Sequence, residues 1–258
     1  MSKVFRFDNF FVKETGILIK KLFRKKIVLG IIFSVLLLGN LNAQSENPLN
    51  ATDVNAFDRL IMNPYSKGLD YTGTAFELLT LSTPAVMFAA PVKDYWKIGL
   101  EYAETIALAW GSKEIAKLCV SRPRPYMYFD GAPAEKIAAG DWDDSFFSGH
   151  STLSFAAATF TTYKFCEYFP DSKYTPFVIV GSYALAATTA CLRLASGNHF
   201  MTDVLCGAAV GSAIGFLVPW VNSFWFKPSV TKENEGELKK SDFAVNLLPN
   251  GFVITCNL

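Results

Sequence analysis

Three residues in the last third of the chain have side chains that could bind and attack a phosphate. Arg193, His199 and Asp203 lie within one eleven-residue stretch. On a helix, the spacing of His199 and Asp203 puts both on one face. The carboxylate can then accept the imidazole Nδ1–H and leave Nε2 free as a nucleophile, while Arg193 offers planar donors for phosphate oxygens. For this stretch alone, a structural salt bridge is the alternative interpretation.

A second group of cations follows an apolar segment. Lys117 lies on the last turns of the helix predicted at 96–120, with Arg122 and Arg124 just beyond it. Pro123 and Pro125 end that helix and impose an extended exit. The cluster predicts an anion site, and the alternative is a set of cations that complement the helix dipole.

The third group, Ser148, Gly149 and His150, directly precedes another apolar segment. Ser148 can cap the helix that begins there, and Gly149 lets a ligand approach the backbone closely. Free N–H groups at a helix N-terminus bind phosphate, where His150 would be placed as a general acid. The alternative is a capping serine beside an interfacial histidine.

In this order and spacing the three groups resemble the tripartite signature of the type 2 phosphatidic acid phosphatase (PAP2) superfamily. That superfamily includes membrane lipid phosphatases, soluble bacterial class A acid phosphatases and vanadium haloperoxidases. The resemblance covers about Tyr71 to Phe226 and departs at two positions, Phe147 for the usual proline and Leu192 for the usual serine. The matching residues are Lys117, Arg124, Pro125, Ser148, Gly149, His150, Arg193, His199 and Asp203.

The resemblance implies a role for each matching residue. His199 would be the nucleophile that forms a phosphohistidine, Asp203 would orient it, and His150 would protonate the leaving oxygen. No metal or cofactor is implied, because cations neutralise the phosphoryl charge. Arg122 is secondary, since its spacing from Lys117 does not fit the motif. The phosphoryl oxygens would be held by Lys117, Arg124, Arg193, Ser148 and the Gly149 N–H.

Five apolar segments must position these residues. They lie at about 71–90, 96–120, 151–168, 175–195 and 204–226, and most are near the length of about 20 residues that crosses a bilayer. We predict an all-α fold, an integral membrane bundle of five to six transmembrane helices with a PAP2-type core. A soluble helical enzyme is the alternative. The charges within the first two segments (Glu77, Glu101, Glu104, Lys113, Glu114 and Lys117) are expected to face the bundle interior or a wet cavity.

Composition supports the membrane interpretation. Of the 258 residues 51% are hydrophobic and only 18% are charged, below the quarter or so typical of soluble domains. A net charge of +1 gives no indication of a nucleic-acid partner. The five cysteines show no metal-binding spacing and are interpreted as small apolar residues.

The chain divides into four parts. Residues 1–43 are a signal peptide or first transmembrane anchor, 44–70 an exported polar segment, and 71–226 the phosphatase core. Residues 227–258 are a cytoplasmic tail, in which Asn250-Gly251 between β-prone runs predicts a hairpin. Lysines in the tail and in the turns near 91–95 and 169–174 fall on one side, so the positive-inside rule places both histidines on the exported face.

The predicted function is hydrolysis of a lipid phosphate monoester or diphosphate in the inner membrane, with a multi-pass chain and a site that faces the periplasm. Candidate substrates are phosphatidate, phosphatidylglycerophosphate, undecaprenyl diphosphate and lipid A phosphates. Alternatives are a soluble periplasmic acid phosphatase, a haloperoxidase, and a non-catalytic membrane transport or binding protein. In the loop 126–149, Asp141, Asp143 and Asp144 are interpreted as a solvated acidic segment.

Overall fold

The structure is a computed structural model that describes residues 49–229, 243–248 and 251–256. The predicted signal peptide or anchor at 1–43 lies outside the described residues. So do 230–242, 249–250 and 257–258 of the predicted tail.

Long helices occupy the predicted apolar segments. They are α3 (Lys67–Leu81), α4 (Tyr95–Cys119), α6 (Gly149–Tyr168), α7 (Thr175–Ala195) and α8 (Met201–Asn222). The first segment is divided, because a 3-10 helix η2 (Thr83–Ala89) follows α3. Pro84 in the first turn of η2 has no N–H to continue an α-helical ladder.

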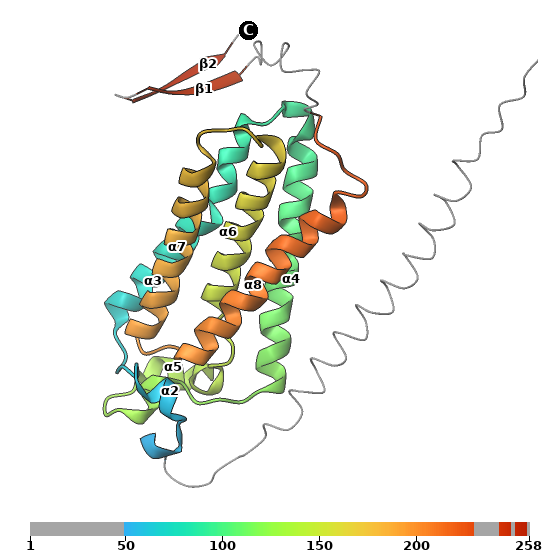
Figure 1. The fold of residues 1–258 in the computed structure, drawn as a ribbon. Coiled ribbons are helices and arrows are strands. Elements are labelled where there is room, and N and C mark those ends of the chain that lie inside the picture. Colours follow the sequence, from blue (N-terminus) through green and yellow to red (C-terminus); the bar gives the residue numbers. More distant parts are fainter. Residues whose placement is uncertain (1–48, 230–242, 249–250, 257–258) are drawn as a thin grey trace, which may run out of the picture. The chain divides into compact units, whose positions relative to one another are not determined.

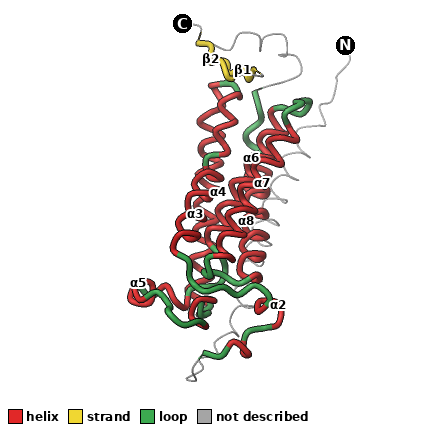
Figure 2. The backbone as a smooth tube through the Cα atoms, turned by 90° about the vertical axis from the view of Figure 1, so that its left-hand side faces the viewer, coloured by secondary structure: helices red, strands yellow, loops and turns green. Residues whose placement is uncertain are grey.

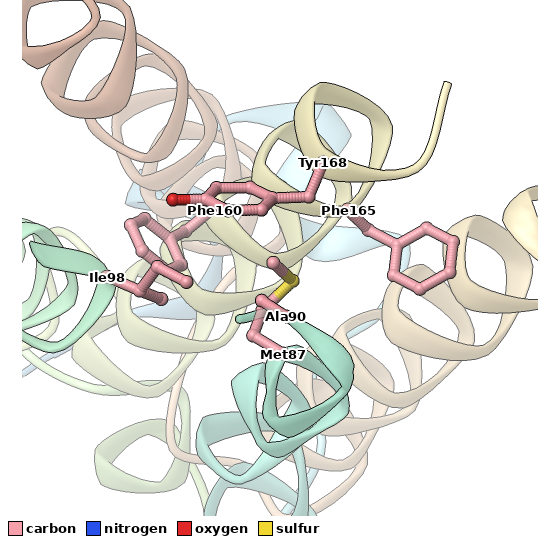
Figure 3. Close-up of a cluster of buried hydrophobic side chains, with 6 residues drawn as sticks. All are labelled: Met87, Ala90, Ile98, Phe160, Phe165 and Tyr168. Atoms are coloured by element: carbon pink, nitrogen blue, oxygen red, sulfur yellow. The ribbon is translucent and has the colours of Figure 1, made fainter. Parts of the chain in front are cut away.

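The helix α6 is the centre of the bundle. It packs against α3, α4, α7 and α8, and Figure 1 shows it between these neighbours. Its buried positions are mostly small residues, among them Ser151, Thr152, Ala156 and Ala157, which allow close approach of helix backbones. Larger apolar side chains hold its second half, where Phe160, Phe165 and Tyr168 pack against Met87, Ala90 and Ile98 (Figure 3).

Short elements connect the long helices. They are η1 (Ala51–Asp53), α2 (Ala56–Arg59), η3 (Val92–Asp94), η4 (Pro125–Tyr128), α5 (Ala134–Ala138) and η5 (Asp141–Asp143). Figure 2 shows α2 and α5 beyond one end of the long helices. In the tail, β1 (Phe243–Leu248) pairs antiparallel with β2 (Gly251–Cys256), in a register that runs from Phe243 opposite Cys256 to Leu248 opposite Gly251.

Several charges within the long helices face inward, as expected. Lys164 on α6 lies 3.0 Å from Glu101 on α4, and both side chains are almost fully buried. Glu77, Lys113 and Lys117 line a cavity described below. Among the described residues, α7 and α8 are the two helices long and apolar enough to cross a membrane. The total of five to six crossing helices therefore stays a prediction.

Candidate active site

A cavity of about 320 Å³ contains most of the predicted site residues. Both histidines line it, although His150 lies in the first turn of α6 and His199 lies in the turn between α7 and α8. Lys117, Arg124, Gly149 and Arg193 line it as well. The other two predicted residues, Ser148 and Asp203, are fully buried and are not among the lining residues.

Two contacts define which nitrogen of the His199 ring carries the proton. Nδ1 lies 2.8 Å from the backbone oxygen of Ser145, which can only accept a hydrogen bond. Nε2 lies 3.2 Å from Nη1 of Arg124, which can only donate one. The neutral ring therefore carries its proton on Nδ1 and a lone pair on Nε2. Burial, followed by the nearby charges of Arg124 and Arg193, holds the pKa of His199 well below its usual value.

Asp203 does not accept the Nδ1–H of His199, which corrects the expected contact. Its Oδ2 lies 3.9 Å from Nδ1, beyond hydrogen-bond distance. The same oxygen accepts hydrogen bonds from the Ser145 hydroxyl at 2.6 Å and from the Phe200 N–H at 2.9 Å. Asp203 thus holds Ser145, and the Ser145 carbonyl holds His199.

The extended exit from α4 explains how Ser145 reaches the histidine. Arg124 donates its backbone N–H to Trp142 at 2.8 Å, and the Ser145 N–H donates to Arg122 at 3.0 Å. These bonds align the chain after α4 with the chain before α6, in agreement with the exit predicted from Pro123 and Pro125. The first and second motifs are therefore joined by backbone pairing close to the cavity.

The acidic residues of the loop 126–149 are not a solvated segment, contrary to their interpretation from sequence. Asp141 accepts hydrogen bonds from Arg124 through Oδ1 at 2.5 Å and through its backbone oxygen at 2.6 Å. Asp144 lies 3.8 Å from Lys117. The carboxylates contact the motif cations because the backbone pairing brings the loop back over the end of α4.

Arg193 has a carboxylate partner from another part of the chain. Its Nη1 lies 2.5 Å from Oδ1 of Asp70 at the start of α3. Asp70 also accepts hydrogen bonds from the Tyr65 hydroxyl at 2.9 Å, and its Oδ2 lies 2.9 Å from Lys136. The buried Nε of Arg193 has no hydrogen-bond partner among the described residues. Arg193 thus lines the cavity with its guanidinium fixed by Asp70.

The start of α6 confirms the predicted cap. The Ser148 hydroxyl accepts hydrogen bonds from the N–H and hydroxyl of Ser151 at 3.4 and 3.0 Å, so it caps the helix. Its contribution to phosphate binding stays a prediction. His150 Nε2 lies 3.2 Å from Thr74 Oγ1 and 3.3 Å from Glu77 Oε2. Burial, followed by the charge of Arg193, lowers the pKa of His150 to about 3, so the ring is neutral in the free protein.

The sequence did not identify all the charges of the cavity. Lys113 lines it one helical turn before Lys117, and this four-residue spacing was the available signal. Lys136 on α5 also lines it, 2.8 Å from Oδ1 of Asn198 and 5.0 Å from the centre of the Tyr65 ring. No sequence pattern marked Lys136, because Asn198 and Asp70, its two nearest polar partners, lie far away along the chain.

The described residues contain no group of three or more His, Cys, Asp or Glu side chains placed to hold a metal ion. Cys119, Cys166, Cys191 and Cys206 are free thiols.

Comparison with known proteins identifies the family. The model of the PAP2 superfamily matches residues 98–227, which is 130 of the 258 residues. The chain therefore belongs to the PAP2 superfamily, as the three motifs indicated.

The proteins that resemble the chain include two curated relatives and a solved structure. Lipid A 1-phosphatase of Porphyromonas gingivalis is 30% identical over 57% of this chain and 30% of its own length. A PA-phosphatase related-family protein of Dictyostelium discoideum is 28% identical over 48% of each chain. The chain thus spans less than half the length of these relatives. A transmembrane PAP2-type phosphatidylglycerolphosphate phosphatase from Bacillus subtilis aligns with 77% of this chain and 96% of its own, at 22% identity and a TM-score of 0.49.

Proposed function

We propose that this protein is a phosphatase that hydrolyses a lipid phosphate monoester or diphosphate through a phosphohistidine on His199. The observation that carries the proposal is the convergence of both histidines with Lys117, Arg124 and Arg193 on one cavity. A neutral imidazole with its lone pair beside a guanidinium is a nucleophile placed where phosphoryl oxygens bind. Arg193, which also lines the cavity, supplies a second guanidinium for such an oxygen.

In the first step Nε2 of His199 attacks phosphorus and forms a P–N bond, while the bond from phosphorus to the leaving oxygen breaks. His150, which takes up a proton as the anionic substrate offsets the charge of the neighbouring guanidinium, gives that proton to the leaving oxygen. His199 retains its Nδ1 proton, so the phosphorylated ring is cationic. The Ser145 carbonyl at 2.8 Å and the Asp203 carboxylate at 3.9 Å stabilise this charge.

In the second step a water attacks phosphorus and gives a proton to His150, which is neutral after the first step. The P–N bond breaks, phosphate leaves, and the lone pair returns to Nε2 of His199. Arg124 and Arg193 neutralise charge as it spreads over the phosphoryl oxygens in both steps. No metal is required in this scheme, because fixed cations supply that stabilisation.

A lipid substrate is supported by the surface of the bundle. Large apolar side chains are exposed along α3, α4, α7 and α8, among them Leu78, Leu108, Phe177 and Phe216. Exposed apolar area of this kind suits lipid better than water. Of the candidate substrates, a lipid A phosphate comes first, because a relative 30% identical to this chain is named lipid A 1-phosphatase.

The proposed orientation puts the cavity at the periplasmic side of the inner membrane. The cavity lies where α6 and α8 begin, while Lys93, Lys97 and Lys173 lie in or next to the turns at the other ends of the helices. Cytoplasmic loops carry an excess of lysine and arginine. The positive-inside rule therefore supports an exported site.

The test is phosphate release by the full chain in detergent, with excess chelator and a panel of lipid A phosphates, phosphatidylglycerophosphate, phosphatidate and undecaprenyl diphosphate. We expect release that survives chelation and is abolished in His199→Ala. Acid-labile, alkali-stable label should accumulate on the wild-type protein during turnover of a ³²P substrate.

A matched control is Lys93→Ala, which removes an exposed cation far from the cavity and should retain full activity. Arg124→Ala removes a buried cation that contacts His199 and should lose most of it. Release that requires a divalent metal, or that persists in His199→Ala, would refute the phosphohistidine route. No release from any substrate by folded protein would refute the phosphatase proposal.

A further inference from the structure

Asp58 is a buried carboxylate that precedes the part of the chain matched by the family model. It lies in α2, and its side chain is fully buried. Oδ1 accepts the Thr202 N–H at 2.8 Å, and Oδ2 accepts the Thr202 hydroxyl at 2.7 Å. Oδ2 also accepts hydrogen bonds from Arg122 and Asn55, each at 2.6 Å. Burial raises the pKa of Asp58, but these hydrogen bonds outweigh it and lower the pKa below its usual value.

One consequence concerns the start of α8. The residue that precedes this helix, Phe200, has no side-chain acceptor for the free N–H groups of the first turn. Asp58 supplies that acceptor from a segment 144 residues away. A carboxylate at a helix N-terminus is also favoured by the helix dipole. Asp58 therefore fixes the start of the helix that directly follows His199.

A second consequence concerns Arg122, which the spacing of the first motif left without a role. One Nη donates to Asp58 and the other donates to Asp203. The guanidinium lies 4.2 Å from the centre of the Phe200 ring. Arg122 is thus held on three sides and places a fixed positive charge next to Asp203. Asp203 in turn accepts a hydrogen bond from the Ser145 hydroxyl at 2.6 Å.

From these contacts we infer that Asp58 is a positioning residue for His199, acting through Arg122, Asp203 and Ser145. The contacts run without interruption from the Asp58 carboxylate to the Nδ1–H of His199. They keep the proton on Nδ1 and the lone pair on Nε2, next to Arg124 at the cavity. This inference rests on the proposed function, in which that lone pair attacks phosphorus. It extends the catalytic unit into the polar segment 44–70.

The first test is the steady-state kinetics of Asp58→Asn, which keeps the shape of the side chain and removes its charge. We expect kcat to fall between about 10- and 100-fold, the loss that follows when a remote change misplaces a reacting group. KM should stay within about twofold, because Lys117, Arg124 and Arg193 do not contact Asp58. Asp53→Asn is the control, since Asp53 is exposed on the neighbouring η1 and should leave both constants unchanged.

The double variant Asp58→Asn/Arg122→Gln separates positioning from simple loss of folding. Arg122→Gln alone leaves Asp58 and Asp203 buried without their shared cation, so it should lower both kcat and Tm strongly. Removing the Asp58 charge as well leaves one buried carboxylate without a cation, Asp203, instead of two. The double variant should therefore be more active and more stable than Arg122→Gln. Losses that simply multiply would show that the two residues are not coupled and would overturn the inference.

A second measurement does not depend on activity, so it separates the failure of this inference from failure of the proposed function. The chain has two histidines, His150 and His199, so ¹⁵N-histidine NMR of the detergent-solubilised protein is readily assigned with His150→Gln. His199 should show one protonated and one unprotonated nitrogen in the wild type, and averaged signals in Asp58→Asn. Unchanged His199 signals in folded Asp58→Asn would overturn the inference, whatever the activity of the variant.

Discussion

The contact between α6 and α8 leads to the sharpest prediction, because it combines close packing with the position of His150. Gly207, Gly211 and Gly215 lie four residues apart on one face of α8. A Cβ built on Gly211 would lie 2.1 Å from the backbone oxygen of Thr152. Ordinary contacts of a Cβ begin at 3.4 Å, so Gly211→Ala requires a displacement of about 1.3 Å.

The displacement must come from the backbone of a helix. The neighbours of the added Cβ include the carbonyl carbon of Thr152 at 2.9 Å and the nitrogen of Ala156 at 3.1 Å, which cannot rotate away. Overpacking of this kind costs about 1–3 kcal/mol. Thr152 lies two residues after His150, so the shift also moves the proposed general acid. A misplacement of about 1 Å can lower a rate about 100-fold, and we expect that loss in kcat.

The measurement is Tm and kcat of Gly211→Ala in detergent, beside the control Gly181→Ala. A Cβ on Gly181 in α7 meets nothing within 4 Å, and alanine is a better helix former than glycine by about 1 kcal/mol. The control should therefore keep its activity and a Tm at least as high as the wild type. Wild-type Tm and kcat in Gly211→Ala would refute the close approach of α6 and α8.

Two further predictions concern His199. Ser145→Ala removes the 2.6 Å hydrogen bond to Asp203 but keeps the carbonyl that accepts the His199 Nδ1–H. We expect kcat to fall about tenfold, the equivalent of about 1.4 kcal/mol. An unchanged kcat would contradict the role of Asp203 in positioning Ser145. The lowered pKa of His199 means that the ring stays neutral as the pH falls through 6.5 and is protonated only at lower pH. The acid limb of kcat/KM for p-nitrophenyl phosphate should therefore lie well below pH 6.5, and a limb centred at pH 6.5 would contradict this.

The helices could be predicted from sequence because their limits are set by local features. The segment predicted at 175–195 is α7 itself, and α6 begins at Gly149, where Ser148 was expected to cap it. Pro84 is the local reason that the first segment is divided. Apolar length, caps and prolines are properties of neighbouring residues, so a single sequence carries them in full.

The convergence of the motifs was expected from the resemblance, but the contacts within the site were not. The four-residue spacing of His199 and Asp203 suggested a direct hydrogen bond, yet the Ser145 carbonyl makes that bond. Nothing near Ser145 in the sequence indicates this, because the contact depends on backbone pairing after α4. Asp58 and Lys136 were missed for the same reason, since their partners lie 144 and 62 residues away.

Carboxylates around the cavity fix the positions of its arginines before a phosphate binds. Arg124 is held by Asp141 and Arg193 by Asp70, so neither guanidinium must be ordered when phosphate arrives. The lining residues nevertheless retain an excess of positive charge. Five are cations (Lys113, Lys117, Arg124, Lys136 and Arg193) and three are carboxylates (Asp70, Glu77 and Asp141), which leaves a formal charge of +2 with both histidines neutral. A phosphate monoester dianion carries the opposite charge, so the cavity is preorganised for the ester, and binding offsets the charge that keeps His150 neutral in the free protein.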